Sequence, residues 1–112
     1  MTQFYNDLSV LIVNFNAGTL LTACVDALLA TPLALEVIVS DNGSTDSSLA
    51  DLEARHGRDP RLRIQRNQAN LGFAGGHNRV LPLARAPYLL FLNPDCLVAP
   101  DTLPRMLDFM ER

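Results

Sequence analysis

Hydrophobic and polar positions follow one another along this chain in blocks that predict strands and helices in alternation. Short apolar runs over Leu8–Val13, Leu35–Val39 and Tyr88–Leu92 have the length and composition of buried strands. The run Leu62–Gln65 is more polar and predicts a strand at the edge of the sheet. Strict alternation of strands and helices is typical of parallel strands joined by right-handed crossovers.

Apolar residues at helical spacing connect these runs. One helix is predicted after the first strand, and a shorter helix, ended by Gly57, is predicted after the second. The first helix has an apolar stripe formed by Leu20, Leu21, Cys24, Val25, Leu28 and Leu29. The second helix has three candidate N-cap residues, Ser44, Thr45 and Asp46.

The last two helices are predicted next to prolines. Gly72–Ala86 is expected to be a loop that runs into a helix, with Val80, Leu81 and Ala84 on its inner face. Pro82 should kink or end this helix, because a proline ring clashes with the carbonyl group four residues earlier. A final helix begins at Pro100 and Asp101, and its apolar stripe consists of Leu103, Met106, Leu107 and Met110.

These elements predict an α/β fold of three layers, with a mainly parallel sheet and helices on both faces. We predict the Rossmann-like strand order 3-2-1-4, in which the first and fourth strands flank the switch point. Ligands of such sheets bind beyond the carboxyl ends of the strands. A chain of 112 residues has room for one domain and one core.

Composition and charge exclude several classes of protein. A hydrophobic fraction of 48% and a charged fraction of 19% are globular values, and a net charge of −3 argues against a nucleic-acid partner. The amino-terminal residues lack the layout of a signal peptide, and no apolar run reaches membrane-spanning length. Cys24 and Cys96 have no paired spacing and suit a reducing compartment, so we predict a cytoplasmic protein.

A lone carboxylate marks the end of the fourth strand. Asp95 follows an apolar run, and it should lie where the strand leaves the sheet because strand interiors do not tolerate a charge. One carboxylate with open coordination sites suits Mg²⁺ or Mn²⁺ bridged to substrate phosphates. The alternative is an aspartate that caps a turn after Pro94. Together with the loops at Asn14, Asp41 and Gly72, the pattern favours metal–diphosphate binding.

Two further loops carry candidate ligand contacts. Asp41 is expected at the end of the second strand, where its carboxylate can accept a hydrogen bond from a ligand. Glycines near the start of the third helix let backbone N–H groups approach an anion, or else make room for packing. Their spacing is not the dinucleotide fingerprint, which argues against a nicotinamide oxidoreductase.

The arginines between positions 55 and 66 predict a solvated face, with Arg66 as a candidate phosphate contact.

Four ordered motifs resemble those of family 2 glycosyltransferases. They are Leu11–Asn16, Ser40–Asp46, Asn70–Asn78 and Leu90–Asp95. The resemblance is closest to the bacterial branch with rhamnosyl- and galactofuranosyltransferases. It implies a GT-A fold, a UDP- or dTDP-sugar donor and, for residues 1–112, the donor-binding half of a domain that is truncated here.

The same resemblance implies roles for individual residues. Asn14 and Asn16 would border the base pocket, Asp41 would bond the base, and Gly72 would lie near the ribose and diphosphate. Asn93 stands where the metal-binding triplet of the family commonly has aspartate, so Asp95 would hold Mg²⁺ or Mn²⁺ almost alone. The residues that the resemblance assigns to the donor are Asn14, Asn16, Asp41, Asn70, Gly72, Gly75, Asn78 and Asn93.

The implied reaction is inverting, metal-assisted transfer of a sugar to a glycan or lipid-linked acceptor in polysaccharide biosynthesis. The general base would lie in an acceptor half beyond this chain, so residues 1–112 should bind the donor weakly and transfer nothing. The alternative is a non-catalytic nucleotide-binding or assembly module with the same fold. The absent half should leave apolar surface uncovered near the fourth strand, which predicts a homo-oligomer. The full-length protein could also lie at the inner face of the membrane.

Overall fold

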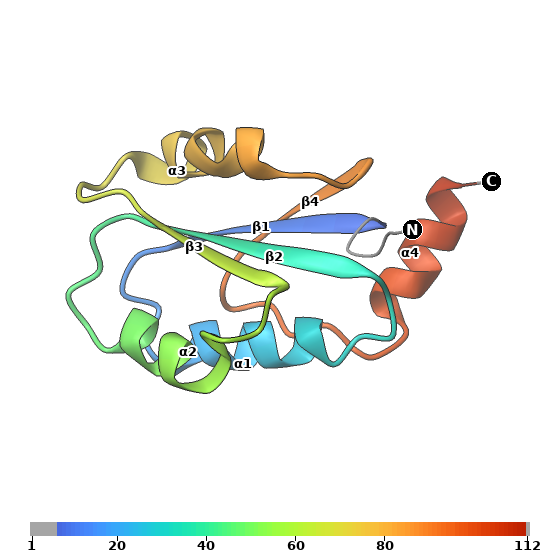
Figure 1. Cartoon of the computed structure of the whole chain (residues 1–112), viewed down its shortest axis with the longest axis horizontal. Helices are drawn as coiled ribbons and strands as arrows, with labels where there is room; N and C mark the ends of the chain where they lie inside the picture. Colours follow the sequence, from blue (N-terminus) through green and yellow to red (C-terminus); the bar gives the residue numbers. More distant parts are fainter. Residues whose placement is uncertain (1–6, 112) are drawn as a thin grey trace.

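A four-stranded parallel sheet organises the molecule, which this computed structural model describes over residues 7–111 (Figure 1). The strands lie in the order β3-β2-β1-β4, and the predicted order is therefore confirmed. Their bounds are β1 Leu8–Asn14, β2 Leu35–Asp41, β3 Leu62–Arg66 and β4 Tyr88–Leu92. Strand β2 is longer than predicted, because Ser40 and Asp41 still pair with β1 and β3.

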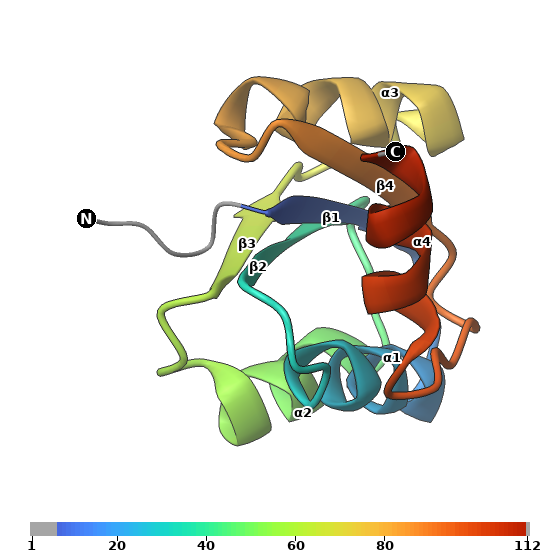
Figure 2. The same ribbon diagram turned by 90° about the vertical axis from the view of Figure 1, so that its right-hand side faces the viewer.

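Helices cover both faces of the sheet, as predicted (Figures 1 and 2). Helices α1 (Thr19–Leu29) and α2 (Ser48–His56) lie on one face, and α3 (Gly72–Val80) lies on the other. Helix α4 (Thr102–Met110) lies beside β4. Among the helices of residues 7–111, none is long and apolar enough to span a membrane.

The two faces of the sheet differ in chemistry. Because side chains alternate along a strand, Leu35, Val37 and Val39 of β2 enter the main core, which α1 and α2 cover. The opposite face of β2 carries Glu36, Ile38 and Ser40, and its apolar cluster is small: Leu11, Ile38 and Val80 are fully buried there. The polar face is therefore the one under α3.

Proline ends the third helix as predicted. Helix α3 stops at Val80, and a 3₁₀ turn over Leu81–Leu83 with Pro82 at its centre leads to β4. The prediction that Leu81 lies on the inner face is wrong, since its side chain is 38% exposed. The stripes of α1 and α4 are likewise narrower than predicted, because Leu20, Met106 and Met110 are 48–62% exposed.

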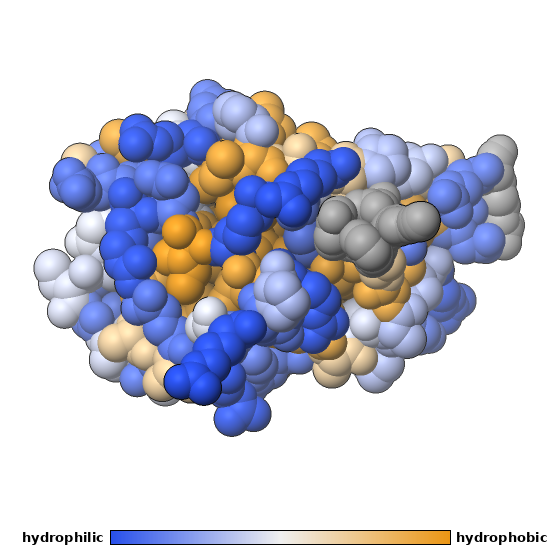
Figure 3. Space-filling view, viewed as in Figure 1, coloured by the Kyte–Doolittle hydropathy of each residue, from blue (hydrophilic) through white to orange (hydrophobic). Residues whose placement is uncertain are grey.

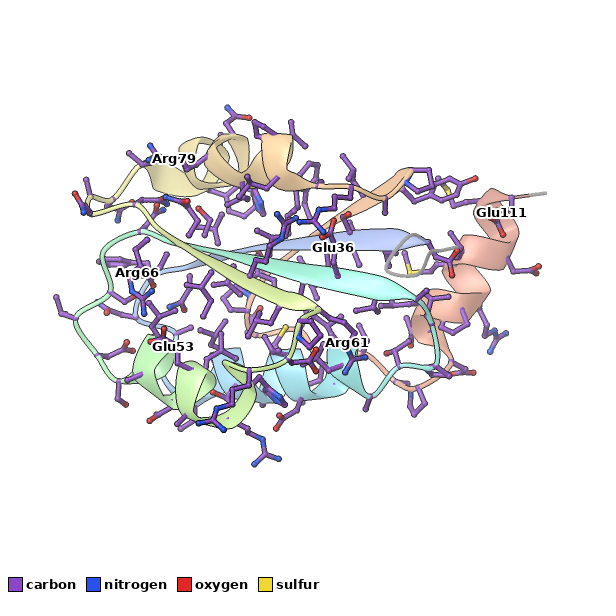
Figure 4. All side chains as sticks on the ribbon, in the orientation of Figure 1. Glu36, Glu53, Arg61, Arg66, Arg79 and Glu111 are labelled. Atoms are coloured by element: carbon purple, nitrogen blue, oxygen red, sulfur yellow. The ribbon has the colours of Figure 1, made fainter. Side chains whose placement is uncertain are left out.

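A buried charge at the second position of β2 corrects the prediction that strand interiors do not tolerate a charge. Glu36 is 3% exposed and accepts hydrogen bonds from the Ser9 hydroxyl (2.6 Å), the Arg85 backbone N–H (2.7 Å) and Arg63 Nη2 (2.9 Å) (Figure 4). Arg63 also donates to the Leu83 carbonyl. Arg63 is therefore part of an internal ion pair, whereas the arginine segment was predicted to be solvated throughout.

Candidate functional site

The loops that follow the strands meet at one edge of the sheet. All neighbouring strands are parallel, so their carboxyl ends point the same way, and Figure 1 places the connections from β1, β2 and β3 together at that edge. Strand β4 lies next to β1, so the segment containing Asp95 leaves the sheet beside the end of β1. This edge is where open α/β sheets bind ligands.

Asn14 and Asp41 form the buried centre of this edge. They are opposite one another in the β1–β2 register, and Asn14 Nδ2 donates to Asp41 Oδ1 at 2.8 Å. Asp41 Oδ1 also accepts from the Ser44 hydroxyl (2.8 Å), and Asp41 Oδ2 accepts from the Ser44 N–H (3.0 Å). Asp41 is 4% exposed. Its carboxylate therefore holds the loop after β2, and only Oδ2 has capacity left for a ligand.

The loops after β1 and β2 are tied to each other. Asn16, whose φ is 53°, accepts the N–H groups of Thr45 (2.7 Å) and Asp46 (3.2 Å) on Oδ1. In return, the Gly18 N–H donates to Asp46 Oδ2 (2.9 Å) and the Asn16 N–H to the Ser44 hydroxyl (2.9 Å). Asn16 is exposed, so its backbone and side chain shape a rim rather than a buried pocket.

Asp46 has a second role at the start of α2. Its Oδ1 accepts the backbone N–H (3.1 Å) and the hydroxyl (2.5 Å) of Ser48, the first residue of the helix. The hydrogen bond from the Ser48 hydroxyl holds the pKa of Asp46 below its usual value, and the Gly18 N–H acts in the same direction. Ser47, rather than Ser44, Thr45 or Asp46, occupies the N-cap position, which corrects the predicted boundary of α2.

Two buried asparagines that the sequence analysis missed anchor the loop after β3. Asn67 Nδ2 donates to Ser40 Oγ (2.8 Å) and to Asn42 Oδ1 (2.9 Å), and Asn42 Nδ2 donates to the Gly72 carbonyl (3.0 Å). The signal for both was their position, one residue past the ends of β2 and β3. They hold the first turn of α3 over the edge of the sheet.

The predicted donor residues of α3 separate into two groups. Gly72 has a φ of 78°, and the Asn70 side chain accepts its N–H at 2.8 Å, so these two residues build the turn into α3. Gly75 lies inside the helix, where an added Cβ would meet Leu71 Cβ at 3.0 Å. Asn78 lies farther along the helix, in a shallow hollow that Phe91 of β4 also lines.

The end of β4 leaves one carboxylate in solvent. Asn93 and Asp95 are exposed, and the Asn93 carbonyl accepts from the Cys96 N–H (3.1 Å) and the Cys24 thiol (3.9 Å). Burial raises the pKa of Cys24 to about 12, with Cys96 and Asp95 adding to the effect. Within residues 7–111, no group of three or more acidic, histidine or cysteine side chains could hold a metal ion. Asp95 alone therefore fits only a cation that takes its other ligands from phosphate and water.

Arg66 at the end of β3 has a protein partner. Its Nη2 lies 2.5 Å from Glu53 Oε2 of α2, and the two side chains are 52% and 42% exposed (Figure 4). The guanidinium group is near the polar edge, but it is engaged with a carboxylate.

Comparison with known proteins gives one family and a consistent fold. The sequence model described as glycosyl transferase family 2 matches residues 9–112. A chondroitin synthase from Pasteurella multocida (strain Pm70) is 34% identical over 94 residues, which cover 83% of this chain and 10% of the synthase.

Solved structures agree with this result. The Staphylococcus aureus protein TarS, residues 1–349, in complex with UDP-GlcNAc, has a TM-score of 0.83 and 25% identity, covering 94% of this chain and 31% of that one. The mannosyltransferase PcManGT from Pyrobaculum calidifontis, in complex with GDP-Man and Mn²⁺, has a TM-score of 0.86 and 22% identity, and covers 94% and 32%. The second likeness shows the fold alone. The chain spans at most 32% of the length of these three proteins.

Proposed function

The chain belongs to glycosyl transferase family 2 and has the fold of the amino-terminal part of a GT-A domain, and on that basis we propose that residues 1–112 bind the nucleotide-sugar donor of a sugar transfer. The donor we propose is a UDP- or dTDP-sugar, and UDP-GlcNAc bound to the similar protein TarS supports the uridine nucleotide. The acceptor we propose is a glycan or a lipid-linked glycan. Assignment to the rhamnosyl- and galactofuranosyltransferase branch stays a prediction.

The observation that carries this proposal is the meeting of polar strand ends at the switch point of the sheet. Asn14 and Asp41 are adjacent at the ends of β1 and β2, and the segment with Asp95 leaves β4 beside β1. Asp41 Oδ2 retains capacity for an N–H group of a base, and the rim formed by Asn16 borders the same place. The residues proposed for donor contact are Asn14, Asn16, Asp41, Asn70, Gly72, Gly75, Asn78 and Asn93.

Asp95 is the proposed ligand of Mg²⁺ or Mn²⁺. Its exposed carboxylate supplies a hard oxygen, and the nearby Asn93 can supply only a neutral amide. A bound divalent cation would offset the negative charge of the diphosphate leaving group. Asp41 is committed to the loop after β2 and addresses the base instead of the metal. The general base that activates the acceptor hydroxyl belongs, in this proposal, to a part of the enzyme outside residues 1–112.

Calorimetric titration of the chain with UDP, dTDP and GDP, with and without Mn²⁺, tests these roles. We expect Asp95→Ala to abolish the dependence on Mn²⁺ and to leave residual metal-independent binding. Asp41→Ala should weaken binding in both conditions and reduce discrimination among the bases. Asp101→Ala, which removes another exposed carboxylate, is the matched control and should bind as the unaltered chain does.

Two results would contradict the proposal. Binding by the unaltered chain that does not change after chelation would exclude Asp95 from the metal role. Binding that Asp41→Ala leaves unchanged, in a variant that melts like the unaltered chain, would exclude Asp41 from the base pocket.

A further inference from the structure

Asn14, the last residue of β1, makes several hydrogen bonds beneath the loop after β2. It is fully buried, and its Nδ2 lies within hydrogen-bond distance of Asp41 Oδ1 (2.8 Å), Ser48 Oγ (3.0 Å) and Ser44 Oγ (3.1 Å). Exchanging the two amide atoms would set Asn14 Oδ1 against the Asp41 carboxylate, acceptor against acceptor, so these contacts fix which atom is the nitrogen. The Asn14 amide is therefore a donor that is used inside the protein.

The other amide atom of Asn14 is unpaired. Its Oδ1 is buried and has no hydrogen-bond partner among residues 7–111. A buried acceptor without a partner is destabilising, and the apolar side chains that precede it, from Val10 to Val13, would not introduce one at this position. Asparagine is therefore not the residue that packing alone favours here, and its role lies in the contacts of Nδ2.

Asp41 is held both by its own loop and by the neighbouring strand. Ser44, three residues farther along, donates its hydroxyl to Asp41 Oδ1 and its N–H to Asp41 Oδ2, so these bonds move with the loop. Asn14 donates from the opposite position of β1 and ties the carboxylate to the sheet. The same amide contacts Ser48, the first residue of α2. Asn14 therefore sets the position of the carboxylate relative to β1 and α2.

We propose that Asn14 is a positioning residue that holds Asp41 as an acceptor for a base N–H group, so that the site selects uracil or thymine over cytosine. This inference rests on the proposed function and refines the part of Asn14 in it, because Asn14 serves the donor through Asp41. The three groups that bond the carboxylate are all donors, so it offers a base only acceptor capacity. Uracil and thymine carry a hydrogen on N3, whereas N3 of cytosine is itself an acceptor and would face the carboxylate unpaired.

The first test compares UDP with CDP, two ligands that differ only in the base, by calorimetry in the presence of Mn²⁺. The unaltered chain should bind UDP at least about tenfold more tightly than CDP, because a polar site rejects an analogue that leaves its acceptor unpaired. Ser48→Ala is the matched control: it removes a contact of Asn14 with α2 and leaves the bond to Asp41 in place. This variant should melt at a lower temperature and keep the preference for UDP.

The second test uses Asn14→Asp, which has nearly the same shape and replaces the donor by a carboxyl group. Two adjacent carboxyl groups share a proton at low pH and repel each other once both are ionised. Relative to the unaltered chain at the same pH, UDP binding by Asn14→Asp should be nearly normal at pH 5 and at least about tenfold weaker at pH 8. The other carboxylate of this network, Asp46, is present in every variant. Ser48→Ala should show no such pH dependence.

A third variant and a readout without nucleotide keep the test decisive if Asn14→Asp folds poorly. Asn14→Ala introduces no charge and should reduce the preference for UDP equally at pH 5 and pH 8. The Ser44 N–H, which donates to Asp41 Oδ2 at 3.0 Å, reports the carboxylate by NMR. Its signal should shift between pH 5 and pH 8 in Asn14→Asp and stay in place in the unaltered chain.

The outcomes separate this inference from the proposed function. A preference for UDP that folded Asn14→Ala retains in full, or a pH profile of Asn14→Asp that follows the unaltered chain, would overturn the role of Asn14 alone. Equal binding of UDP and CDP by the unaltered chain would overturn the selection against cytosine. Binding of neither nucleotide would overturn the proposed function and the base selection with it, while the Ser44 signal would still report the bond between Asn14 and Asp41.

Discussion

The two edges of the sheet, β3 and β4, have the same length but differ in charge. β3 has the sequence Leu-Arg-Ile-Gln-Arg, and its two arginines reach carboxylates on neighbouring elements. β4 has the sequence Tyr-Leu-Leu-Phe-Leu and carries no charge. Figure 3 shows the β3 side, where hydrophilic residues cross the surface with apolar side chains visible between them. The difference teaches that β3 is built to end a sheet, whereas β4 is built to be covered.

The same arginines connect the β3 edge to the interior. Arg63 reaches across to Glu36 of β2 and to the 3₁₀ turn before β4, so one side chain connects β3, β2 and that turn. Arg66 ends in a surface ion pair with Glu53. Arg63 is held in a largely buried ion pair, whereas Arg66 is in an exposed one. The two ion pairs should therefore contribute different amounts to the free energy of unfolding.

The largest effect is expected from the buried pair. Arg63→Met leaves the Glu36 carboxylate buried without its cation and should lower the free energy of unfolding by about 3 kcal/mol. Adding Glu36→Gln should restore most of the loss, because a neutral amide still accepts the bonds from Ser9 and Arg85. Urea denaturation measures both. A double variant as unstable as Arg63→Met alone would show that the loss comes from packing, not from the uncompensated charge.

The next effect is expected where α3 packs closely against Val13 of β1. A Cβ at Gly76 would lie 2.9 Å from both methyl groups of Val13 and 3.2 Å from Asn42 Nδ2, so Gly76→Ala should lift the helix and cost about 2 kcal/mol. Gly75→Ala, in the same helix, gains the same helical propensity but meets only the Leu71 side chain. Comparing the melting temperatures of Gly76→Ala and Gly75→Ala isolates the contact between α3 and β1. Equal melting temperatures would argue against a close contact at Gly76.

A smaller effect should appear in the pH dependence of stability. Burial holds the pKa of His77 below its usual 6.5, so the unfolded chain binds a proton first as the pH falls. Stability should be complete above pH 6.5 and decline below it, through the lowered pKa. His77→Leu should flatten this decline. The shifted aspartates Asp26, Asp46 and Asp59 have pKa values below 3.8 and do not titrate in this window.

The smallest effect is expected at the exposed end of β3. The Arg66–Glu53 pair should contribute about 0.5 kcal/mol, because water screens both groups and ordering two long side chains has an entropic cost. A double-mutant cycle with Arg66→Ala and Glu53→Ala measures this coupling energy. A coupling energy above about 2 kcal/mol would mean that these charges stabilise the fold, in addition to keeping the β3 edge from pairing with other strands.

Much of the fold could be predicted from the spacing of apolar residues. The four strands and the helix stop before Pro82 depend on local patterns, and the strand order follows from the Rossmann-like topology that alternating strands and helices favour; the structure has all of them. Glu36 could not be predicted as a buried residue, because its three donors come from β1, β3 and the segment after α3. A charge inside an apolar run reveals its burial only when its partners are known.

The site shows the same limit. Asp41 was correctly expected at the end of β2, but its engagement by Ser44 and Asn14 depends on which loops come together in space. Asn42 and Asn67 resemble ordinary turn residues in the sequence, and only their contacts with Ser40 and Gly72 identify them as supports of α3. The pattern could predict where polar residues gather, and it could not predict how they bond.

The bonds between the loops after β1 and β2 also bear on how this sequence can diverge. Asn16 holds the Thr45 and Asp46 amides, and Asp46 holds the Gly18 amide, so each loop is kept in shape by a side chain of the other. A substitution at Asn16 or at Asp46 alone removes a restraint on the opposite loop, and at Asp46 it also removes the hydrogen bonds to Ser48. Across descendants of this chain, the two positions should therefore change in the same lineages, although 30 residues separate them.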